Sequence, residues 1–203
     1  MASDAFFVPI SARRSIYSIS AASPIPDSRI VEIVQRTIKH VPSAFNVQSA
    51  RAVVLLKDEH QKFWTFADAA VKGALPEAVY TVLAPKLAGF KGGYGTVLFF
   101  EDQADLAALK ASNQNVAPFV EEWSEHSSGA HQFTVWTALE AEGLGASLQH
   151  YNFLPTFSEK VWEEWKLPKD WKLRSQLVFG TPTGDPRERT YKPLEDRVKV
   201  FGQ

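Results

Sequence analysis

The spacing of apolar residues in segment 26–42, PDSRIVEIVQRTIKHVP, predicts an amphipathic helix. Asp27 stands where a side chain can cap the first turn, and Pro42 ends the pattern. The predicted apolar face consists of Ile30, Val31, Val34 and Ile38. The run RAVVLL at 51–56 is apolar on both faces, so it predicts a buried strand that starts soon after this helix ends.

Further helical patterns cover much of the remaining chain, at 59–73, 77–90, 119–143 and 156–168. We expect Gly73 to stop the first of these helices and Pro85 to break the second. The third pattern ends at Gly143, and its second half is apolar with few charges. This long helix is therefore expected to lie at the centre of the fold.

Short apolar runs predict three more strands, at 96–100, in GASLQ from 145 onward, and at 174–180. Strands that alternate with helices indicate a layered α/β or α+β architecture around one sheet. The chain has 203 residues, which suits a single domain over 1–203 and leaves little room for a second.

The tail, residues 181–203, is rich in proline and charge, and two interpretations of it stay open. Such a composition is typical of a disordered segment. The tail also ends in RVKVF, whose alternation makes Val198, Val200 and Phe201 available for burial in a strand. An extended tail of this kind can pair with another subunit.

Composition narrows the classes of function. Hydrophobic residues make up 45% of the chain and aromatic residues 12%, which allows a sizeable core and also a subunit interface. The formal charge is −1, so the chain lacks the surplus of basic residues that would indicate nucleic-acid binding. The chain has no cysteine, which excludes disulfides, zinc–thiolate sites and thiol catalysis.

No segment predicts export or insertion into a membrane. The N-terminus, MASDAFFVPISARRS, lacks the apolar core of a signal peptide. No window approaches the run of about 20 apolar residues that spans a bilayer. We expect a soluble cytoplasmic protein, or a nuclear one if the source is fungal.

Two groups of basic residues are candidates for binding an anion. Arg13, Arg14 and Ser15 combine two guanidinium groups with a hydroxyl, which suits a phosphate, although a solvated helix end explains them more simply. The tail supplies a second cationic set, Arg187, Arg189 and Lys192. This set either completes a phosphate site with the first or is a solvated charge run.

A third group of polar residues lies between the first predicted helix and its strand. Ser43, Asn46 and Gln48 offer hydroxyl and amide groups that both donate and accept hydrogen bonds. Such groups suit a flat heterocycle such as a flavin or a base. A helix cap followed by an Asx turn is the alternative.

The sequence contains no recognisable catalytic set of side chains. His126 and His131 have the wrong spacing for two metal ligands on one helix face, and HExxH is absent. GxSxG is also absent. With neither a nucleophile nor a metal site predicted, a cofactor would have to supply the chemistry.

Taken together and in order, four motifs resemble those of the nitroreductase family of FMN-dependent oxidoreductases. They are RRSIY, PSAFNVQSAR, ALEAEGLGASLQ and RERTYKPLED, and the resemblance extends from about residue 7 to residue 201. The sequences of the segments RRSIYSIS and GASLQHYN are most similar to those of a small fungal and bacterial branch of the family, which is linked to lipid signalling and oxidative stress. The resemblance implies a three-layer α+β fold with a mostly antiparallel central sheet flanked by helices.

The resemblance also implies a set of FMN-binding residues. The phosphate and ribityl chain would be held by Arg13, Arg14, Ser15, Arg189 and Lys192. The ribityl chain and pyrimidine side of the flavin would contact Ser43, Asn46 and Gln48. The flavin N5 would be faced by backbone N–H groups at the end of a strand, those of Leu148, Gln149 and His150. Relatives of this kind are intertwined homodimers with FMN at the subunit interface, so the extension at about 181–203 would embrace a partner subunit.

The implied activity is a two-step reduction. NADH or NADPH passes hydride to the flavin and leaves, and a nitroaromatic or quinone acceptor then takes the electrons, with no obligatory catalytic side chain. A flavin-binding regulatory or stress protein with little turnover is the alternative. It is suggested by Tyr17, which stands where the family often has a basic residue, and by LQHYN in place of a Pro-x-Glu-Gly-like run.

Overall fold

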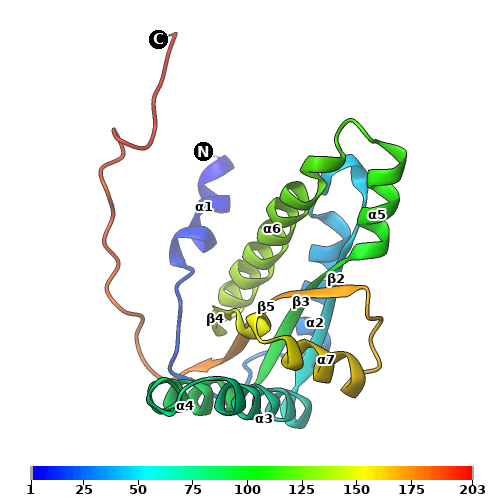
Figure 1. Ribbon diagram of the computed structural model, residues 1–203. Coiled ribbons are helices and arrows are strands. Elements are labelled where there is room, and N and C mark those ends of the chain that lie inside the picture. The colour runs from blue at the N-terminus through cyan, green and yellow to red at the C-terminus, as the bar shows by residue number, and fades with distance from the viewer. Residues whose placement is uncertain (1, 203) are drawn as a thin grey trace.

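The computed structural model describes residues 2–202 of the chain (Figure 1). Its helices are α1 (Ala2–Ala12), α2 (Asp27–His40), α3 (Lys57–Ala74), α4 (Glu77–Lys91), α5 (Gln103–Ser112), α6 (Val120–Ala141) and α7 (Pro155–Glu164). Its strands are β1 (Ile19–Ser20), β2 (Ala50–Leu56), β3 (Gly95–Asp102), β4 (Gly145–Gln149) and β5 (Trp171–Pro182). Single 3₁₀ turns occupy Ala44–Asn46, Ala117–Phe119 and Tyr151–Phe153.

The named strands form one antiparallel sheet. β5 is its central strand, because it pairs with β1, β3 and β4, while β2 pairs with β3. The α+β fold with a mostly antiparallel sheet, which the resemblance implied, is confirmed. The intertwined homodimer with a swapped extension stays a prediction.

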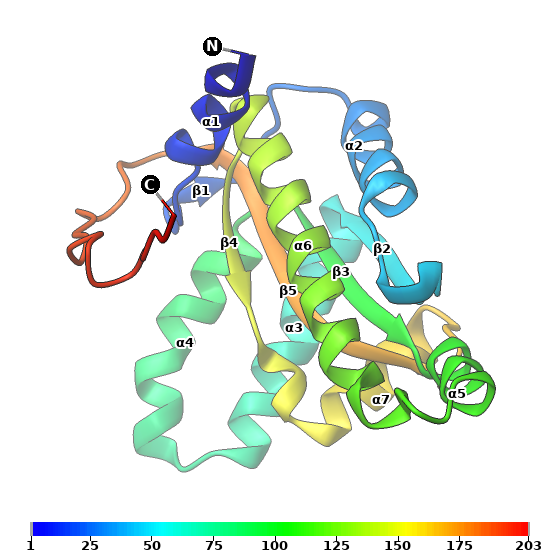
Figure 2. The same cartoon turned by 90° about the horizontal axis from the view of Figure 1, so that it is seen from above.

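Helices cover both faces of the sheet and make three layers (Figures 1 and 2). The side chains of β3 alternate between the two faces, as in any strand. Leu98 and Phe100 are buried with residues of α3, α4 and α7, and Val97 and Phe99 are buried with residues of α2 and α6. Full burial of side chains of this size stabilises a fold by roughly 1.5–3 kcal/mol each, so β3 is a main source of cohesion between the layers.

Helix α2 has the predicted location but different details at its start and on its buried face. Pro26 is the N-cap, and the predicted cap by Asp27 is wrong. The Asp27 carboxylate instead accepts hydrogen bonds from Lys57 Nζ at 2.6 Å and from the Tyr94 hydroxyl. The fully buried positions are Ile30, Ile33, Val34 and Thr37, whereas the predicted Val31 and Ile38 are only half-buried.

The predicted break of α4 at Pro85 is wrong, and α3 ends one residue beyond the predicted stop at Gly73. Helix α3 continues through Gly73 and ends before Leu75, which takes an extended conformation because a proline follows it. Helix α4 continues through Pro85 to Lys91. A proline inside a helix costs about 3 kcal/mol. Burial of Leu87 and Phe90 on the same helix offsets that cost.

Three elements have no counterpart in the sequence prediction: α1, α5 and β1. Helix α5 had a recognisable signal, because the Asp102 carboxylate accepts a hydrogen bond from the Ala104 N–H and caps the first turn. Helix α1 contains Pro9 and has large apolar side chains exposed, so it shows no amphipathic pattern. Strand β1 has only two residues and depends entirely on its pairing with β5.

The chain beyond β5 is extended and exposed. Thr181 and Pro182 still belong to β5, so the extension starts after them. RVKVF forms no strand within this chain, and its side chains Val198, Val200 and Phe201 are 60–90% exposed. Among the residues described, no helix is long and apolar enough to cross a membrane.

Candidate functional site

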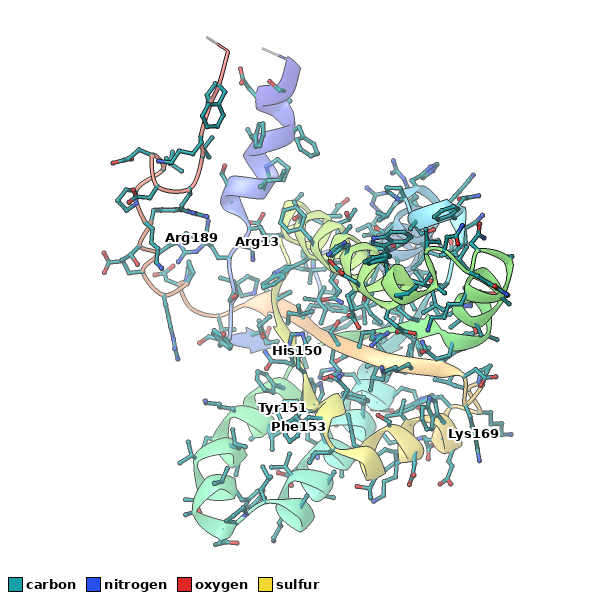
Figure 3. The ribbon with its side chains drawn as sticks, turned by 45° about the horizontal axis from the view of Figure 1, so that its top comes forward. Arg13, His150, Tyr151, Phe153, Lys169 and Arg189 are labelled. Atoms are coloured by element: carbon teal, nitrogen blue, oxygen red, sulfur yellow. The ribbon has the colours of Figure 1, made fainter. Side chains whose placement is uncertain are left out.

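Arginines from the two ends of the chain meet beside α1. Arg189 donates from Nη2 to the Arg13 carbonyl oxygen at 2.7 Å, and Arg14 donates from Nη2 to the Arg187 carbonyl oxygen. Figure 3 shows Arg13 and Arg189 next to each other. The two predicted cationic sets are thus brought together, apart from Lys192, which is exposed and does not line the cavity that the others share.

The sheet fixes the position of the N-terminal arginines. Ser15 forms a parallel bridge with Ala146 of β4, and the Ile16 N–H donates to the Ala146 carbonyl oxygen at 2.9 Å. Arg13 and Arg14 therefore lie between the end of α1 and the start of β4. The motif RRSIY therefore lies next to the motif ALEAEGLGASLQ in the fold.

Arg13 carries an incompletely neutralised charge. Its guanidinium lies 4.3 Å from the centroid of the Trp136 ring on α6, and its Nε is buried with no hydrogen-bond partner among the described residues. Burial and then the neighbouring Arg189 lower the pKa of Arg13, while the Glu140 carboxylate acts in the opposite direction. Positive charges this close together favour a bound anion, because an anion offsets their mutual repulsion.

Two cavities adjoin each other at this place. The first has a volume of about 450 Å³ and a net positive wall, in which Arg13, Arg14, Ser15 and Arg189 lie beside the carboxylate of Glu188. The second has a volume of about 480 Å³, and its wall includes the aromatic side chains of Phe90 and Tyr151. Tyr17 and Arg187 line both cavities.

The end of β4 leads into the aromatic cavity. Gln149 lines this cavity and donates from Nε2 to the Ser147 hydroxyl at 3.0 Å. Leu148 instead packs against the core beneath α2 and α6. His150 is exposed at the start of the next turn, close to Tyr151 (Figure 3). The Tyr151 N–H is held by the buried Gln176 side chain at 2.8 Å, which fixes the backbone where β4 ends.

The loop with the remaining predicted residues is unusual in its backbone. Phe45, Asn46 and Gln48 all have φ between 51° and 55°, a region that residues other than glycine rarely adopt. Ser43 stabilises this loop, because its hydroxyl accepts a hydrogen bond from the Gln48 N–H at 2.9 Å. The side-chain amides of Asn46 and Gln48 are exposed and make no hydrogen bond to another described residue. Their donors and acceptors are free for a ligand.

Within one chain, this loop does not meet the arginines. The loop packs against α6 through Phe45, whose ring stacks on Trp123 at 5.9 Å. Arg13 packs on the same helix at Trp136. Thirteen residues of helix separate the two contacts by about 20 Å along the axis and by about 140° around it. Of the predicted site residues, Ser43, Asn46 and Gln48 therefore form a separate group.

Part of the cavity wall could not be predicted from the sequence. Arg187 belongs to the tail set that could complete a phosphate site but not to the FMN-binding residues that the resemblance implies, and Tyr17 is predicted only as a departure from a motif. Phe90 and Tyr151 had no signal at all, since their place in the wall depends on how α4 packs beside β4. A group of three or more metal-binding side chains is absent from the described part of the chain.

The fold is that of nitroreductases. Nitroreductase CinD from Lactococcus lactis, solved with chloramphenicol, has a TM-score of 0.87 and 38% identity, with 97% of this chain and 100% of that chain covered. A nitroreductase with bound FMN from Desulfitobacterium hafniense shares the fold at a TM-score of 0.67 and 15% identity, with 96% of each chain covered.

Sequence comparison gives the same result. The profile of the Nitroreductase family matches residues 10–181. Nitroreductase FRM2 from Saccharomyces cerevisiae is 36% identical over 200 residues, which cover 95% of this chain and 94% of the yeast protein. The chain therefore belongs to the nitroreductase family.

Proposed function

We propose that this protein is an FMN-dependent NAD(P)H oxidoreductase that reduces nitroaromatic or quinone-type acceptors. The observation that carries the proposal is the junction of a cationic cavity with an aromatic one, joined through Tyr17 and Arg187. FMN has the matching composition, since an anionic phosphate is linked to a flat aromatic ring. Bound FMN would supply the chemistry of hydride and electron transfer.

The described residues fit the two parts of FMN. Arg13, Arg14 and Arg189 would hold the phosphate, and Ser15 adds a hydroxyl donor in the same cavity wall. The buried Arg13 Nε without a partner supports this assignment, because a buried donor of this kind is costly unless a ligand pairs with it. Phe90, with Tyr151 beside it, would cover the flavin ring and exclude water from it.

A second copy of the chain would complete the site. Ser43, Asn46 and Gln48 belong to a loop that packs against α6 at Trp123, far from the contact of Arg13 with Trp136, so they would contact a flavin held by the arginines of a partner. Large apolar side chains in α1, the 43–48 loop and the tail are more than half exposed in the single chain. Exposed apolar surface on this scale is typical of an interface, which supports a homodimer.

Relatives support the acceptor class. CinD from Lactococcus lactis has been solved with chloramphenicol, with 4-nitrophenol and with nicotinic acid. The first two ligands are nitroaromatics, and the third shares its pyridine ring with the nicotinamide of NADH and NADPH. For the present chain we accordingly propose a nitroaromatic acceptor and a nicotinamide donor that use the aromatic cavity in turn.

Separating the two half-reactions tests this function. FMN-loaded protein is mixed with NADH or NADPH without oxygen or acceptor, and bleaching of the flavin absorbance is expected. After removal of the donor, 4-nitrophenol or a quinone should restore the absorbance, and both together should give continuous NAD(P)H oxidation. Bound FMN that is neither bleached by NADH nor by NADPH would contradict the proposal and favour a regulatory flavoprotein.

A further inference from the structure

Arg187 lies at the boundary between the two cavities. It contributes to the cationic cavity together with Arg189, and to the aromatic cavity together with Gln149. Arg189 lines the cationic cavity and not the aromatic one. Of the four clustered arginines, Arg187 is thus the one whose charge borders the space proposed for the flavin ring.

The position of Arg187 is fixed at two points. Its guanidinium carbon lies 5.3 Å from the centroid of the Tyr17 ring, a cation–π distance. Its backbone carbonyl accepts the hydrogen bond from Arg14, which ties this part of the tail to the segment after α1. Among the described residues, no carboxylate forms an ion pair with Arg187. Glu188 lines the cationic cavity, whereas the wall of the aromatic cavity contains Arg187 and no carboxylate. The exposed, unpaired charge of Arg187 therefore faces the aromatic cavity without a neighbouring anion in that wall.

We propose that Arg187 sets the reduction potential of the bound flavin and that Tyr17 positions its charge. This inference rests on the proposed function. A hydride from NADH or NADPH brings two electrons and one proton, leaves the nicotinamide oxidised, and adds one negative charge to the flavin ring. A cation beside the ring stabilises that added charge directly. A cation beside the phosphate acts on the oxidised and reduced forms almost equally, because the phosphate charge does not change.

The two arginines therefore have different expected effects, which a comparison of variants measures. We would determine the dissociation constants for oxidised and reduced FMN, and the midpoint potential by anaerobic dye titration, in wild type, Arg187→Gln and Arg189→Gln. For Arg187→Gln we expect the reduced form to be weakened on the order of tenfold more than the oxidised form. That ratio corresponds to a potential about 30 mV more negative. Arg189→Gln should weaken both forms alike and leave the potential unchanged.

Two more variants make the result decisive. Arg187→Lys keeps the charge and should restore most of the potential, and Tyr17→Leu keeps Arg187 but removes the ring that holds it. If Arg187→Gln cannot be saturated with FMN, the midpoint potential of the Tyr17→Leu variant tests the inference instead. We expect that potential to be more negative than the potential of wild type. An unchanged potential in the saturated Arg187→Gln variant, or in Tyr17→Leu if it has to decide, would overturn the inference. Wild type without FMN affinity would instead refute the proposed function.

Discussion

At the scale of single residues, the arginine cluster is the part of the candidate site that could best be predicted from the sequence. Arg13, Arg14 and Arg189 were assigned to one phosphate from two distant motifs, and the structure brings them to one cavity wall. The hydrogen bond between Arg14 and the Arg187 carbonyl joins residues 173 positions apart. No local pattern indicates a contact of that range, so the meeting of the two cationic sets could be predicted only from the order of the motifs.

The cluster gives a direct comparison of two tail cations. Arg189→Ala should weaken FMN binding, since a charge-assisted hydrogen bond to phosphate contributes about 1.5–3 kcal/mol. Lys192→Ala is the matched control, because Lys192 is exposed and lies outside the wall of both cavities. Fluorescence titration of FMN measures both affinities. Equal losses for the two variants would show that the tail acts only through its overall charge.

A second residue-scale prediction concerns His60, which is fully buried in α3. Its Nδ1 lies 2.8 Å from the Thr96 hydroxyl, which also accepts a hydrogen bond from the Trp64 indole at 2.9 Å. Burial lowers the pKa of His60 to about 4. The unfolded chain protonates His60 near pH 6.5, so its neutral form stabilises the fold above that pH. This contribution, about 3 kcal/mol, should be lost as pH falls from about 6.5 to about 4.

Urea unfolding of wild type and His60→Gln at several pH values between 4 and 7.5 tests this expectation. The glutamine variant cannot titrate at this position, so its stability should fall less steeply with decreasing pH. Other titrating groups are common to both proteins and cancel in the difference. Parallel pH profiles would mean that His60 does not remain neutral in the fold.

At the scale of elements, the buried strands and long helices were predictable because their patterns are strong and local. The apolar runs of β2, β3 and β5 and the long pattern of α6 all form where expected, with ends that differ by a few residues. The errors have physical causes that a local pattern does not contain. Helix α4 continues through Pro85 because tertiary burial offsets the local cost, and β1 exists only through its pairing with β5.

The pairing of β1 with β5 depends on the absence of a side chain at Gly180. A side chain at this position would overlap the Ser20 carbonyl oxygen, which belongs to the backbone of β1. Gly180→Ala should therefore lower the free energy of unfolding by about 1–3 kcal/mol. Gly73→Ala is a suitable control, because a side chain there meets nothing within 4 Å and α3 is helical at that point.

The control should move stability in the other direction. An exposed helical glycine replaced by alanine typically gains about 0.5–1 kcal/mol. Thermal or urea unfolding followed by far-ultraviolet circular dichroism measures both variants. A Gly180→Ala protein as stable as wild type would show that β1 can shift away from β5 without loss.

At the scale of the whole molecule, the proposed binding site requires a second copy of the chain. Its arginine cluster and its 43–48 loop lie at different ends of α6, and its tail leaves Leu194, Val198, Val200 and Phe201 more than half exposed. A chain that stops at residue 192 keeps the arginines but loses these apolar side chains. We expect it to sediment as a monomer and to bind FMN much more weakly than the full chain.

A full-length Glu195→Gln variant is the control for the truncation, since it changes the tail charge and keeps every apolar side chain. It should remain a dimer with unchanged FMN affinity. A truncated chain that still sediments as a dimer with normal FMN affinity would contradict the role proposed for the tail.

Whether the joined cavities hold FMN is tested most directly by the visible spectrum of the purified protein. The full-length protein is incubated with excess FMN, desalted, and its absorbance is recorded before and after denaturation. We expect a flavin spectrum that stays with the protein, and release of FMN stoichiometric with the chain on denaturation. A colourless protein after desalting, with no change in FMN fluorescence on titration, would contradict the account.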